Sequence, residues 1–230
     1  MREDLKGYRN IVFFGGAGTS TECGIPDFRS AKGLFSMAPE SILSHTTLIN
    51  NPEIFFKFCR ENLYYPDSEP VEGHFILKDL EERGLLKAII TQNIDSMHQK
   101  AGSKNVVELH GTLIKNYCIT TGEEFSMEYV LNYPEIIPRC DKCGDIVRPD
   151  VVLYEEQLDY HSIERAIKYL EEADLLILCG SSFVVQPACS LIFNSKARKI
   201  LINLEATPID NYVDEVMRMG FSQGLKLLFK

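Results

Sequence analysis

Short apolar runs recur along the chain and alternate with segments that have helical spacing. The runs are rich in Val, Ile, Leu and Phe, and they span residues 11–14, 87–90, 106–109, 175–179 and 199–203. Runs of this length are typical of strands that are buried on both faces of a sheet. Because such runs alternate with helical segments, the pattern predicts an α/β fold with a doubly wound, parallel, Rossmann-like sheet.

Two of the intervening segments show the periodicity of amphipathic helices. In residues 75–83, the side chains expected on the buried side are Phe75, Leu77 and Leu80. In residues 162–172, they are Ile163, Ala166, Ile167 and Leu170. Apolar residues three and four positions apart lie on one face of a helix, so we expect both segments to cover the sheet.

Two stretches depart from this alternation. Residues 39–67 are rich in aromatic side chains and are expected to be helical, whereas residues 116–149 contain three cysteines. We expect these two stretches to form a smaller inserted module. The larger domain is then expected to comprise residues 1–38, 68–115 and 150–230.

The composition narrows the class of protein. With 230 residues, the chain is long enough for one large domain or for one domain with a small insert. A net charge of -9 disfavours a nucleic-acid-binding surface and suits a partner that carries lysines. We see no apolar signal segment and no run of membrane-spanning length, so we expect a cytoplasmic protein that does not bind membranes. Seven cysteines without regular spacing suit reduced thiols better than disulfides.

A glycine-rich loop follows the first apolar run. Residues 15–30 read GGAGTSTECGIPDFRS, and glycines at a strand end let the backbone approach a phosphate closely, which indicates a nucleotide site. The fingerprint of hydride-transferring dehydrogenases requires a third glycine three residues after Gly18, where this chain has Thr21. An ordinary dehydrogenase is therefore disfavoured. Taken alone, the loop also fits a strand-to-helix turn that only needs glycine.

A second polar stretch follows the apolar run at residues 87–90. It reads TQNIDSMHQKAGS and places Gln92, Asn93 and Asp95 at the carboxyl end of an expected parallel strand. Open α/β sheets bind ligands at that edge. His110 ends the next apolar run, and a histidine there is either a hydrogen-bonded structural residue or a base.

Several motifs occur in a characteristic order and spacing along nearly the whole chain. They are GAGTSTECGIPDFRS, TQNIDSMHQKAGS, ELHGT, RPDVVLYEE, CGSSFVVQPA and INLEATPID. Together they resemble the sirtuin family of NAD-dependent protein deacylases, above all its compact bacterial deacetylases. The resemblance implies that an acylated lysine and NAD meet between a Rossmann-like NAD-binding domain and an inserted module with a helical and a zinc-ribbon-like part.

The resemblance also implies the chemistry. The acyl oxygen attacks the anomeric carbon of the nicotinamide ribose and expels nicotinamide, and the resulting imidate leads to O-acyl-ADP-ribose and free lysine. The residue that matches the family's base, which activates the ribose 2′-hydroxyl, is His110. The ordinary pKa of a histidine, near neutrality, suits this role. Asn93 is the second residue that we expect to take part in catalysis.

The same resemblance carries over the contacts with the cofactor. The nicotinamide pocket matches Ile25, Asn93, Ile94 and Asp95. The ribose and diphosphate positions match Gly16, Ala17, Gly18, Ser20, Thr21, Asp27, Phe28, Arg29, Gln92 and His110. The adenosine end matches Gly180, Ser181, Ser182, Asn203 and Glu205.

Some of these acids have a simpler interpretation. A carboxylate at Glu205 binds ribose hydroxyls and repels a 2′-phosphate, which favours NAD over NADP. Alternatively, Glu205 is a solvated surface acid, and Asp27 and Asp95 only cap helices.

Two loops resemble those that clamp the substrate peptide of this family as an added strand. The expected contacts are Val151, Val152, Leu153, Tyr154, Phe183 and Val184. Backbone pairing of this kind tolerates many sequences, so the partners are expected to be acyl-lysine proteins of varied sequence. By analogy with small sirtuins, we expect a monomer.

The acyl pocket is expected to favour neutral groups. In the desuccinylase branch of the family, a Tyr and an Arg on the helix before a Gly-His pair bind the acyl carboxylate. An alignment from Gly73 and His74 places Phe58 and Glu61 at those positions. An acid at Glu61 would repel a succinyl group.

The cysteines of the inserted module raise the question of a metal. Sirtuins that resemble this chain hold a structural zinc with two Cys-x-x-Cys pairs. Here Cys140 and Cys143 form one complete pair, whereas Cys118 is followed by Thr121 in place of the fourth cysteine.

Two outcomes are open for this module. In one, the three thiolates bind zinc together with a carboxylate, Glu123 or Asp141, or with a water molecule. In the other, the cysteines are free and the module is held together by apolar contacts of Phe125, Tyr129 and Ile136.

Two other functions are open on the same residues. A mono-ADP-ribosyltransferase or NAD hydrolase would use the same cofactor pocket and release nicotinamide without an acyl peptide. A non-catalytic module would bind NAD without turnover, although Asn93, Asp95 and His110 argue against it.

Overall fold

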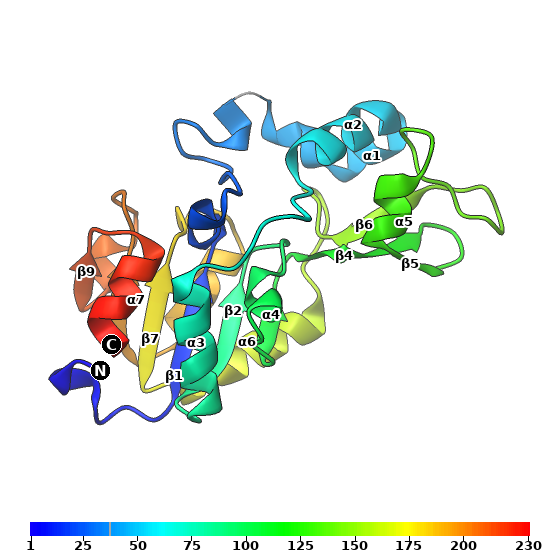
Figure 1. The fold of residues 1–230 in the computed structure, drawn as a ribbon. Coiled ribbons are helices and arrows are strands. Elements are labelled where there is room, and N and C mark those ends of the chain that lie inside the picture. The colour runs from blue at the N-terminus through cyan, green and yellow to red at the C-terminus, as the bar shows by residue number, and fades with distance from the viewer. Residues whose placement is uncertain (37) are drawn as a thin grey trace.

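A six-stranded parallel sheet forms the larger part of the molecule (Figure 1), and the computed structural model describes residues 1–36 and 38–230. The strands lie in the order β3-β2-β1-β7-β8-β9. Their bounds are β1 Ile11–Gly15, β2 Leu86–Thr91, β3 Val106–Glu108, β7 Leu175–Cys179, β8 Arg198–Ile202 and β9 Glu215–Met217. Each neighbouring pair is parallel, which confirms the predicted doubly wound sheet. The strand order reverses between β1 and β7, and open α/β sheets bind ligands in the crevice at such a point.

Helices cover both faces of this sheet. On one face lie α3 (Glu72–Glu82) and α7 (Phe221–Phe229), and on the other lie α6 (Tyr160–Glu172) and the 3-10 helix η6 (Ala188–Asn194). Successive side chains of β1 alternate between these layers, so that Phe13 packs with the first pair and Phe14 with the second. The sheet is therefore buried on both faces, as the apolar runs predict.

A three-stranded antiparallel sheet and several helices form the smaller part (Figure 1). Its strands are β4 (Gly111–Cys118), β5 (Glu124–Ser126) and β6 (Val147–Val151), in the order β5-β4-β6, and its helices are α1 (His45–Asn50), α2 (Pro52–Asn62) and α5 (Met127–Asn132). Side chains of α2 and β4, among them Phe55 and Leu113, share one hydrophobic core. This small sheet extends from residue 111 to residue 151 and is thus longer at both ends than the predicted insert 116–149. The boundaries of the domains stay a prediction.

Local signals in the sequence explain where three of these helices begin. The side chains of Ser44, Ser126 and Asp159 accept hydrogen bonds from backbone amides in the first turns of α1, α5 and α6. Such capping satisfies amides that have no partner inside the helix. Shorter elements are α4 Met97–Lys100, η1 Glu3–Leu5, η2 Ala17–Thr19, η3 Thr21–Cys23, η4 Leu34–Ser36, η5 Glu40–Leu43 and η7 Asp210–Tyr212.

The predicted buried side of α3 is wrong at one position. The side chain of Phe75 is 50% exposed, whereas Ile76, Leu77 and Leu80 are buried. In α6, Ala166 and Leu170 are buried as predicted, and Ile163 and Ile167 pack beside them. The helical phase of α3 is set by residues 76, 77 and 80, which share one face, and Phe75 lies outside that face.

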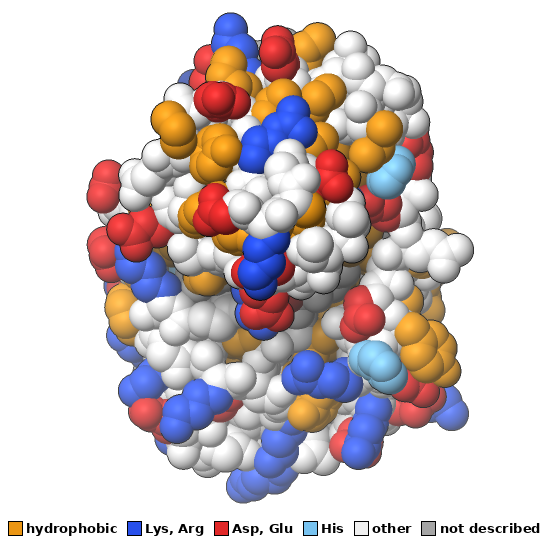
Figure 2. Space-filling view, turned by 90° about the vertical axis from the view of Figure 1, so that its right-hand side faces the viewer, with side chains coloured by type: hydrophobic (Ala, Val, Ile, Leu, Met, Phe, Trp, Pro, Cys, Tyr) orange, Lys and Arg blue, Asp and Glu red, His pale blue; other side chains and the backbone are white. Residues whose placement is uncertain are grey.

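The surface carries charges of both signs. On the face shown in Figure 2, acidic and basic side chains are interspersed rather than gathered by sign. Among the described residues, no helix combines the length and the apolar character that crossing a membrane requires.

Candidate active site

The glycine loop packs directly against the loop that follows β7. A Cβ atom added at Gly18 would lie 2.7 Å from the Cα of Gly180, and one added at Gly16 would lie 2.9 Å from the Cβ of Ser181. The backbones of the two loops are also joined, because the Gly18 amide donates to the Gly180 carbonyl over 2.7 Å. These glycines are therefore needed for the approach of the two loops at the switch point of the sheet.

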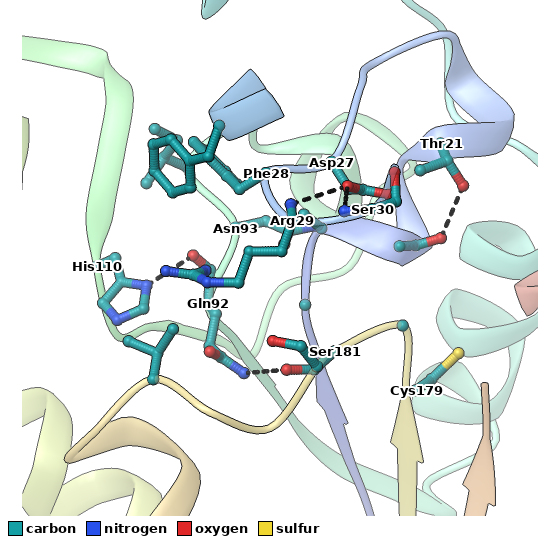
Figure 3. A pocket seen from close by; sticks show the side chains of 18 of the residues that line it. Thr21, Asp27, Phe28, Arg29, Ser30, Gln92, Asn93, His110, Cys179 and Ser181 are labelled. Atoms are coloured by element: carbon teal, nitrogen blue, oxygen red, sulfur yellow. Dashed lines mark hydrogen bonds between the residues drawn. The ribbon is translucent and has the colours of Figure 1, made fainter. Parts of the chain in front are cut away.

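A cleft of about 730 Å³ lies between the carboxyl edge of the large sheet and the smaller part (Figure 3). Its lining includes most of the positions expected to bind a dinucleotide, which follow β1, β2, β3, β7 and β8. They are Gly16, Ala17, Gly18, Thr21, Asp27, Phe28, Arg29, Gln92, Asn93, Ile94, His110, Gly180, Ser181, Ser182, Asn203 and Glu205. A cavity of this size suits a small-molecule cofactor together with part of a second substrate.

A small cavity of about 30 Å³ adjoins the cleft. Its lining brings together the four residues expected around nicotinamide, which are Ile25, Asn93, Ile94 and Asp95. Ser20 also lines this cavity. Because Asn93 and Ile94 line both spaces, the small cavity is a side pocket of the cleft.

The orientation of Asn93 is fixed by its neighbours. Its Nδ2 donates to the hydroxyl oxygens of Thr19 and Ser20, each over 3.0 Å. The Thr19 hydroxyl donates its own hydrogen to the Gly16 carbonyl, so its oxygen can only accept a hydrogen bond from Asn93. The atom of Asn93 that faces Thr19 is therefore the nitrogen Nδ2 and not the oxygen Oδ1. Within residues 1–36 and 38–230, no donor reaches the buried Asn93 Oδ1. A buried acceptor without a partner is a place for a ligand to donate a hydrogen bond.

His110 lies between β3 and β4 with a defined tautomer. Its Nδ1 lies 2.9 Å from the backbone carbonyl oxygen of Gln92 (Figure 3). Because a carbonyl only accepts, Nδ1 carries the hydrogen, and the neutral ring keeps its lone pair at Nε2. Burial lowers the pKa of His110, and the positive charge of Arg29 acts in the same direction. The imidazole is therefore suited to act as a base at neutral pH.

Asp95 and Asp27, the two acids with helix capping as their simpler interpretation, each accept hydrogen bonds from backbone amides two or three residues further along the chain. Asp95 Oδ1 accepts from the Met97 amide at the start of α4 over 2.9 Å. Asp27 Oδ1 accepts from the amides of Arg29 and Ser30 (Figure 3). Burial raises the pKa of the Asp95 carboxyl. Asp27 lines the cleft, and Asp95 lines its side pocket.

Residues that line the cleft also contact one another. Arg29 Nη2 donates to the hydroxyl of Tyr154 over 2.7 Å and forms an ion pair with Glu40. The Val152 amide donates to the carbonyl of His110 over 2.9 Å. The segment after β6 is thereby held beside His110.

The positions expected to contact the peptide separate into two groups. Val151, Val152, Leu153 and Tyr154 line the cleft. Val184 is exposed, whereas the Phe183 side chain is buried and stacks on Phe14 with 6.2 Å between ring centres. Any contact of Phe183 with a peptide is thus left to its backbone. Two hydrogen bonds lie near the positions expected to bind adenosine: Gln92 Nε2 donates to the Ser181 hydroxyl over 3.2 Å, and Asn203 Nδ2 donates to the Glu205 carbonyl.

The helical stretch 39–67, which the sequence interpretation places over the cleft, contributes an apolar wall whose individual residues were not predicted. Leu43, Phe55, Cys59 and Leu63 line the cleft. Three of them follow the i, i+4, i+8 spacing of one helix face, which was the available signal. Val185, at the end of the second expected peptide-clamping loop, also lines the cleft, and further lining residues that were not predicted include Phe35, Gln186, Pro187, Met219, Gly220 and Phe221.

The alignment that placed Phe58 and Glu61 in the acyl pocket is wrong. Glu61 is exposed, and neither residue is part of the cleft lining that the structure describes. The neighbouring Arg60 donates to the backbone carbonyls of Tyr133 and Glu135. The helix α2 thus turns a different face to the cleft than a gap-free alignment from Gly73 and His74 implies.

Three cysteines of the smaller part form a cluster that fits a metal ion. The sulfur atoms of Cys118, Cys140 and Cys143 lie within 4.8 Å of one another, the one such group found among the described residues. Thiolates are preferred zinc ligands, and a structural zinc site is usually tetrahedral. The donor set therefore fits zinc with one position still to be filled.

The sequence of residues 16–187 matches the model of the Sir2 family. The chain belongs to the Sir2, or sirtuin, family.

Curated relatives of this sirtuin are described as NAD-dependent protein deacetylases. The protein of Clostridium acetobutylicum is 54% identical over 224 residues, which cover 94% of this chain and 91% of the relative. That of Clostridium tetani is 51% identical, over 91% of this chain and 88% of the relative. That of Staphylococcus aureus is 42% identical, over 92% of each.

Solved Sir2 structures share the fold of this sirtuin. One described as Sir2-p53 peptide-NAD+ has a TM-score of 0.88 and 35% identity, and the match covers 97% of this chain and 93% of that chain. A Sir2 variant with deacetylated p53 peptide and 3′-O-acetyl-ADP-ribose has a TM-score of 0.92 and 34% identity, over 96% and 93%. Sir2Tm bound to a propionylated peptide has a TM-score of 0.88 and 34% identity, over 97% and 93%.

Proposed function

We propose that this sirtuin is an NAD-dependent protein-lysine deacetylase. The observation that carries the proposal is the neutral His110 in the cleft, with its Nδ1 bound to a carbonyl, beside a side pocket lined by Asn93 and Asp95. The curated relatives at about half identity bear the same description. The products are nicotinamide, O-acyl-ADP-ribose and free lysine.

The side pocket holds the nicotinamide group. Asn93 Oδ1 and the Asp95 carboxylate are acceptors for the carboxamide hydrogens, and Ile25 and Ile94 pack against the ring. Bound NAD supplies the ribose carbon that the acyl oxygen attacks, with nicotinamide as the leaving group. Phe28, which lines both spaces, excludes water from this carbon.

His110 accepts the proton of the ribose 2′-hydroxyl at Nε2. The hydrogen bond from Nδ1 to the Gln92 carbonyl fixes both the tautomer and the direction of the ring. Because burial lowers the pKa of His110, the base is neutral at pH 7 and needs no prior deprotonation. The same carbonyl stabilises the protonated ring that results.

The remaining contacts follow the strand ends. The glycine loop and Arg29 bind the diphosphate, Gln92 binds the nicotinamide ribose, and Ser181 lies at the adenosine side. The Glu205 carboxylate binds the adenosine ribose and disfavours a 2′-phosphate, which makes NAD the preferred cofactor.

The acyl-lysine peptide adds as a strand beside residues 151–154. Backbone pairing at this edge accepts many sequences, so the partners are acylated proteins of varied sequence. The solved Sir2 structures are described with p53 and propionylated peptides. We further propose that this sirtuin is a monomer that binds neither nucleic acid nor membranes, which its net charge of -9 supports. A cytoplasmic location is supported by seven free thiols, all within the described part of the chain.

One experiment tests the activity. The protein is incubated with an acetyl-lysine peptide and NAD, and the products are followed by mass spectrometry. We expect nicotinamide, deacetylated peptide and O-acetyl-ADP-ribose in equal amounts. Nicotinamide released equally fast without peptide would instead indicate an NAD hydrolase or ADP-ribosyltransferase, and NAD binding without any turnover would indicate a sensing module.

A further inference from the structure

The metal cluster of the smaller part is built from two equivalent turns. In the first, the Gly122 amide donates to the Cys118 carbonyl over 2.9 Å, and in the second the Gly144 amide donates to the Cys140 carbonyl over 2.8 Å. Both glycines have left-handed φ angles, 69° and 75°. The first turn therefore keeps the backbone of a Cys-x-x-Cys-Gly turn although it has lost its second cysteine.

The residue in place of the missing cysteine is Thr121. Its hydroxyl oxygen lies 4.0 Å from the sulfur of Cys140, and it accepts a hydrogen bond from the Glu123 amide over 3.3 Å. The Thr121 amide points toward the sulfur of Cys118 at 3.5 Å. A neutral hydroxyl is not among the usual zinc ligands, which are thiolate, imidazole and carboxylate. Thr121 thus supports the cluster by hydrogen bonds and leaves one ligand position open.

A carboxylate stands next to that position. Glu123 Oε2 lies 3.6 Å from the sulfur of Cys140, while its other oxygen, Oε1, forms an ion pair with Lys142 at 2.7 Å. Two other acids lie nearby, and each accepts a hydrogen bond from a hydroxyl: Asp141 from Tyr129 over 3.0 Å, and Asp145 from Thr120 over 2.5 Å. Of the three carboxylates, only that of Glu123 contacts a sulfur of the cluster among the described residues.

We propose that Glu123 is the fourth ligand of a zinc ion held by Cys118, Cys140 and Cys143. The Glu123 carboxylate contacts the sulfur of Cys140 but is not within 4.8 Å of all three sulfurs. Its side chain therefore has to turn toward the sulfurs of Cys118 and Cys143 when zinc binds. Its partly exposed position leaves it free to do so. Lys142 offsets part of the negative charge that three thiolates and a carboxylate bring to one ion.

The proposal is tested by zinc affinity rather than by activity. Protein freed of metal under reducing conditions is titrated with zinc against a chromophoric chelator, and cobalt binding is followed by its visible spectrum. We expect about one zinc per chain in the parent and a loss of at least about tenfold in affinity for Glu123→Gln. The cobalt bands of this variant shift because the ligand set changes.

Three matched variants separate the carboxylate from its surroundings. Lys142→Met breaks the same ion pair but keeps the carboxylate, Asp141→Asn removes an equal charge nearby, and Thr121→Val removes the hydroxyl. We expect each of these variants to lose less zinc affinity than Glu123→Gln does and to keep the cobalt spectrum of the parent, because the set of ligands is unchanged. Thr121→Cys should restore a four-thiolate site and bind zinc at least as tightly in a Glu123→Gln background as the parent does.

Three results would overturn the proposal. The first is a parent protein that binds no zinc. The second is a Glu123→Gln variant with the affinity and cobalt spectrum of the parent, which would leave the position to water. The third is a large loss in Thr121→Val or Asp141→Asn but not in Glu123→Gln. Far-ultraviolet circular dichroism of each variant confirms that the compared proteins are folded.

Discussion

At the scale of single residues, His110 is oriented by a backbone carbonyl and not by a carboxylate. A carboxylate partner would raise the pKa of the ring, whereas here burial lowers it below the ordinary value of about 6.5. The base is active when neutral, so activity is lost only when the pH falls through this lowered pKa. We expect the acidic limb of kcat/KM for an acetyl peptide to have its midpoint below pH 6.5. A midpoint clearly above that value would contradict the assignment.

Removal of the His110 side chain tests the same role directly. The backbone contact from the Val152 amide to the His110 carbonyl is retained in His110→Ala, so the fold and NAD binding should stay near those of the parent. Loss of general base catalysis typically costs about a hundredfold to ten thousandfold in rate. We expect kcat to fall by that order, measured by product formation at saturating NAD. A variant within a few fold of the parent would remove His110 from the base role.

Glu155, which lines the cleft, has a left-handed backbone conformation with a φ of 76°. This conformation is disfavoured for residues that have a Cβ. The Glu155 carboxylate accepts from the amide and the hydroxyl of Thr46, over 2.9 and 2.8 Å, and so ties the loop to α1. Glu155→Ala loses these bonds and keeps the strained backbone, whereas Glu155→Gly loses both. We expect a lower urea midpoint for Glu155→Ala than for Glu155→Gly, and the reverse order would show that the strain is negligible.

At the scale of elements, α3 and α4 meet through two buried histidines. The rings of His74 and His98 lie 4.8 Å apart, and both side chains are buried. In the part of the chain that the structure describes, His74 Nε2 and both ring nitrogens of His98 have no hydrogen-bond partner. Burial lowers the pKa of His74 to about 4 and that of His98 well below its ordinary value. Each ring is therefore neutral in the folded protein.

This pair makes stability depend on pH. Below about 6.5 the unfolded chain binds protons at these histidines and the folded chain does not, so the free energy of unfolding falls as the pH decreases from about 6.5 toward 4. Urea unfolding at pH 7, 6 and 5 measures the fall. The lowered pKa of His110 also reduces the stability at acidic pH. The contribution of the buried pair is therefore isolated by comparison with His98→Gln, whose free energy of unfolding should fall less over the same pH range. Equal falls in the two proteins would exclude the pair as the cause.

The elements that the sequence predicts well are those whose signal is local. The strands at residues 11–14 and 175–179 are continuous apolar runs, because a parallel sheet buries both of their faces. The buried face of α3 cannot be read from the sequence alone, since Phe75, Ile76 and Leu77 are consecutive apolar residues. Only packing against the sheet and α7 decides which of them is buried.

At the scale of the whole molecule, the sequence predicts one wall of the cleft better than the other. Strand ends lie at one edge of a parallel sheet, so Asn93 and Gly180 are placed by topology and motif alone. The opposite wall, with Leu43 and Phe55, comes from helices whose position depends on how the smaller part packs over the cleft. The i, i+4, i+8 spacing on α2 indicates an apolar face but not where that face lies relative to the cleft, and the gap-free alignment selected the wrong face.

We expect this apolar wall to govern the choice of acyl group. The side chains of Leu43, Phe55, Cys59 and Leu63 offer a carboxylate no positive charge and only the weak donor of the Cys59 thiol, while Arg29 is engaged by Tyr154 and Glu40. A buried carboxylate without a partner is strongly disfavoured. We expect kcat/KM for acetyl and propionyl peptides to exceed that for a succinyl peptide of the same sequence by at least about tenfold.

A variant of Glu61 distinguishes this explanation from charge repulsion by that residue. Because Glu61 is exposed and is not among the residues described as lining the cleft, Glu61→Gln should leave the ratio of acetyl to succinyl activity unchanged. If repulsion by Glu61 excluded the succinyl group, the same variant would raise succinyl activity selectively, since one unfavourable charge would be gone. A selective rise would return Glu61 to the pocket, and succinyl activity above acetyl activity in the parent would contradict an apolar acyl site altogether.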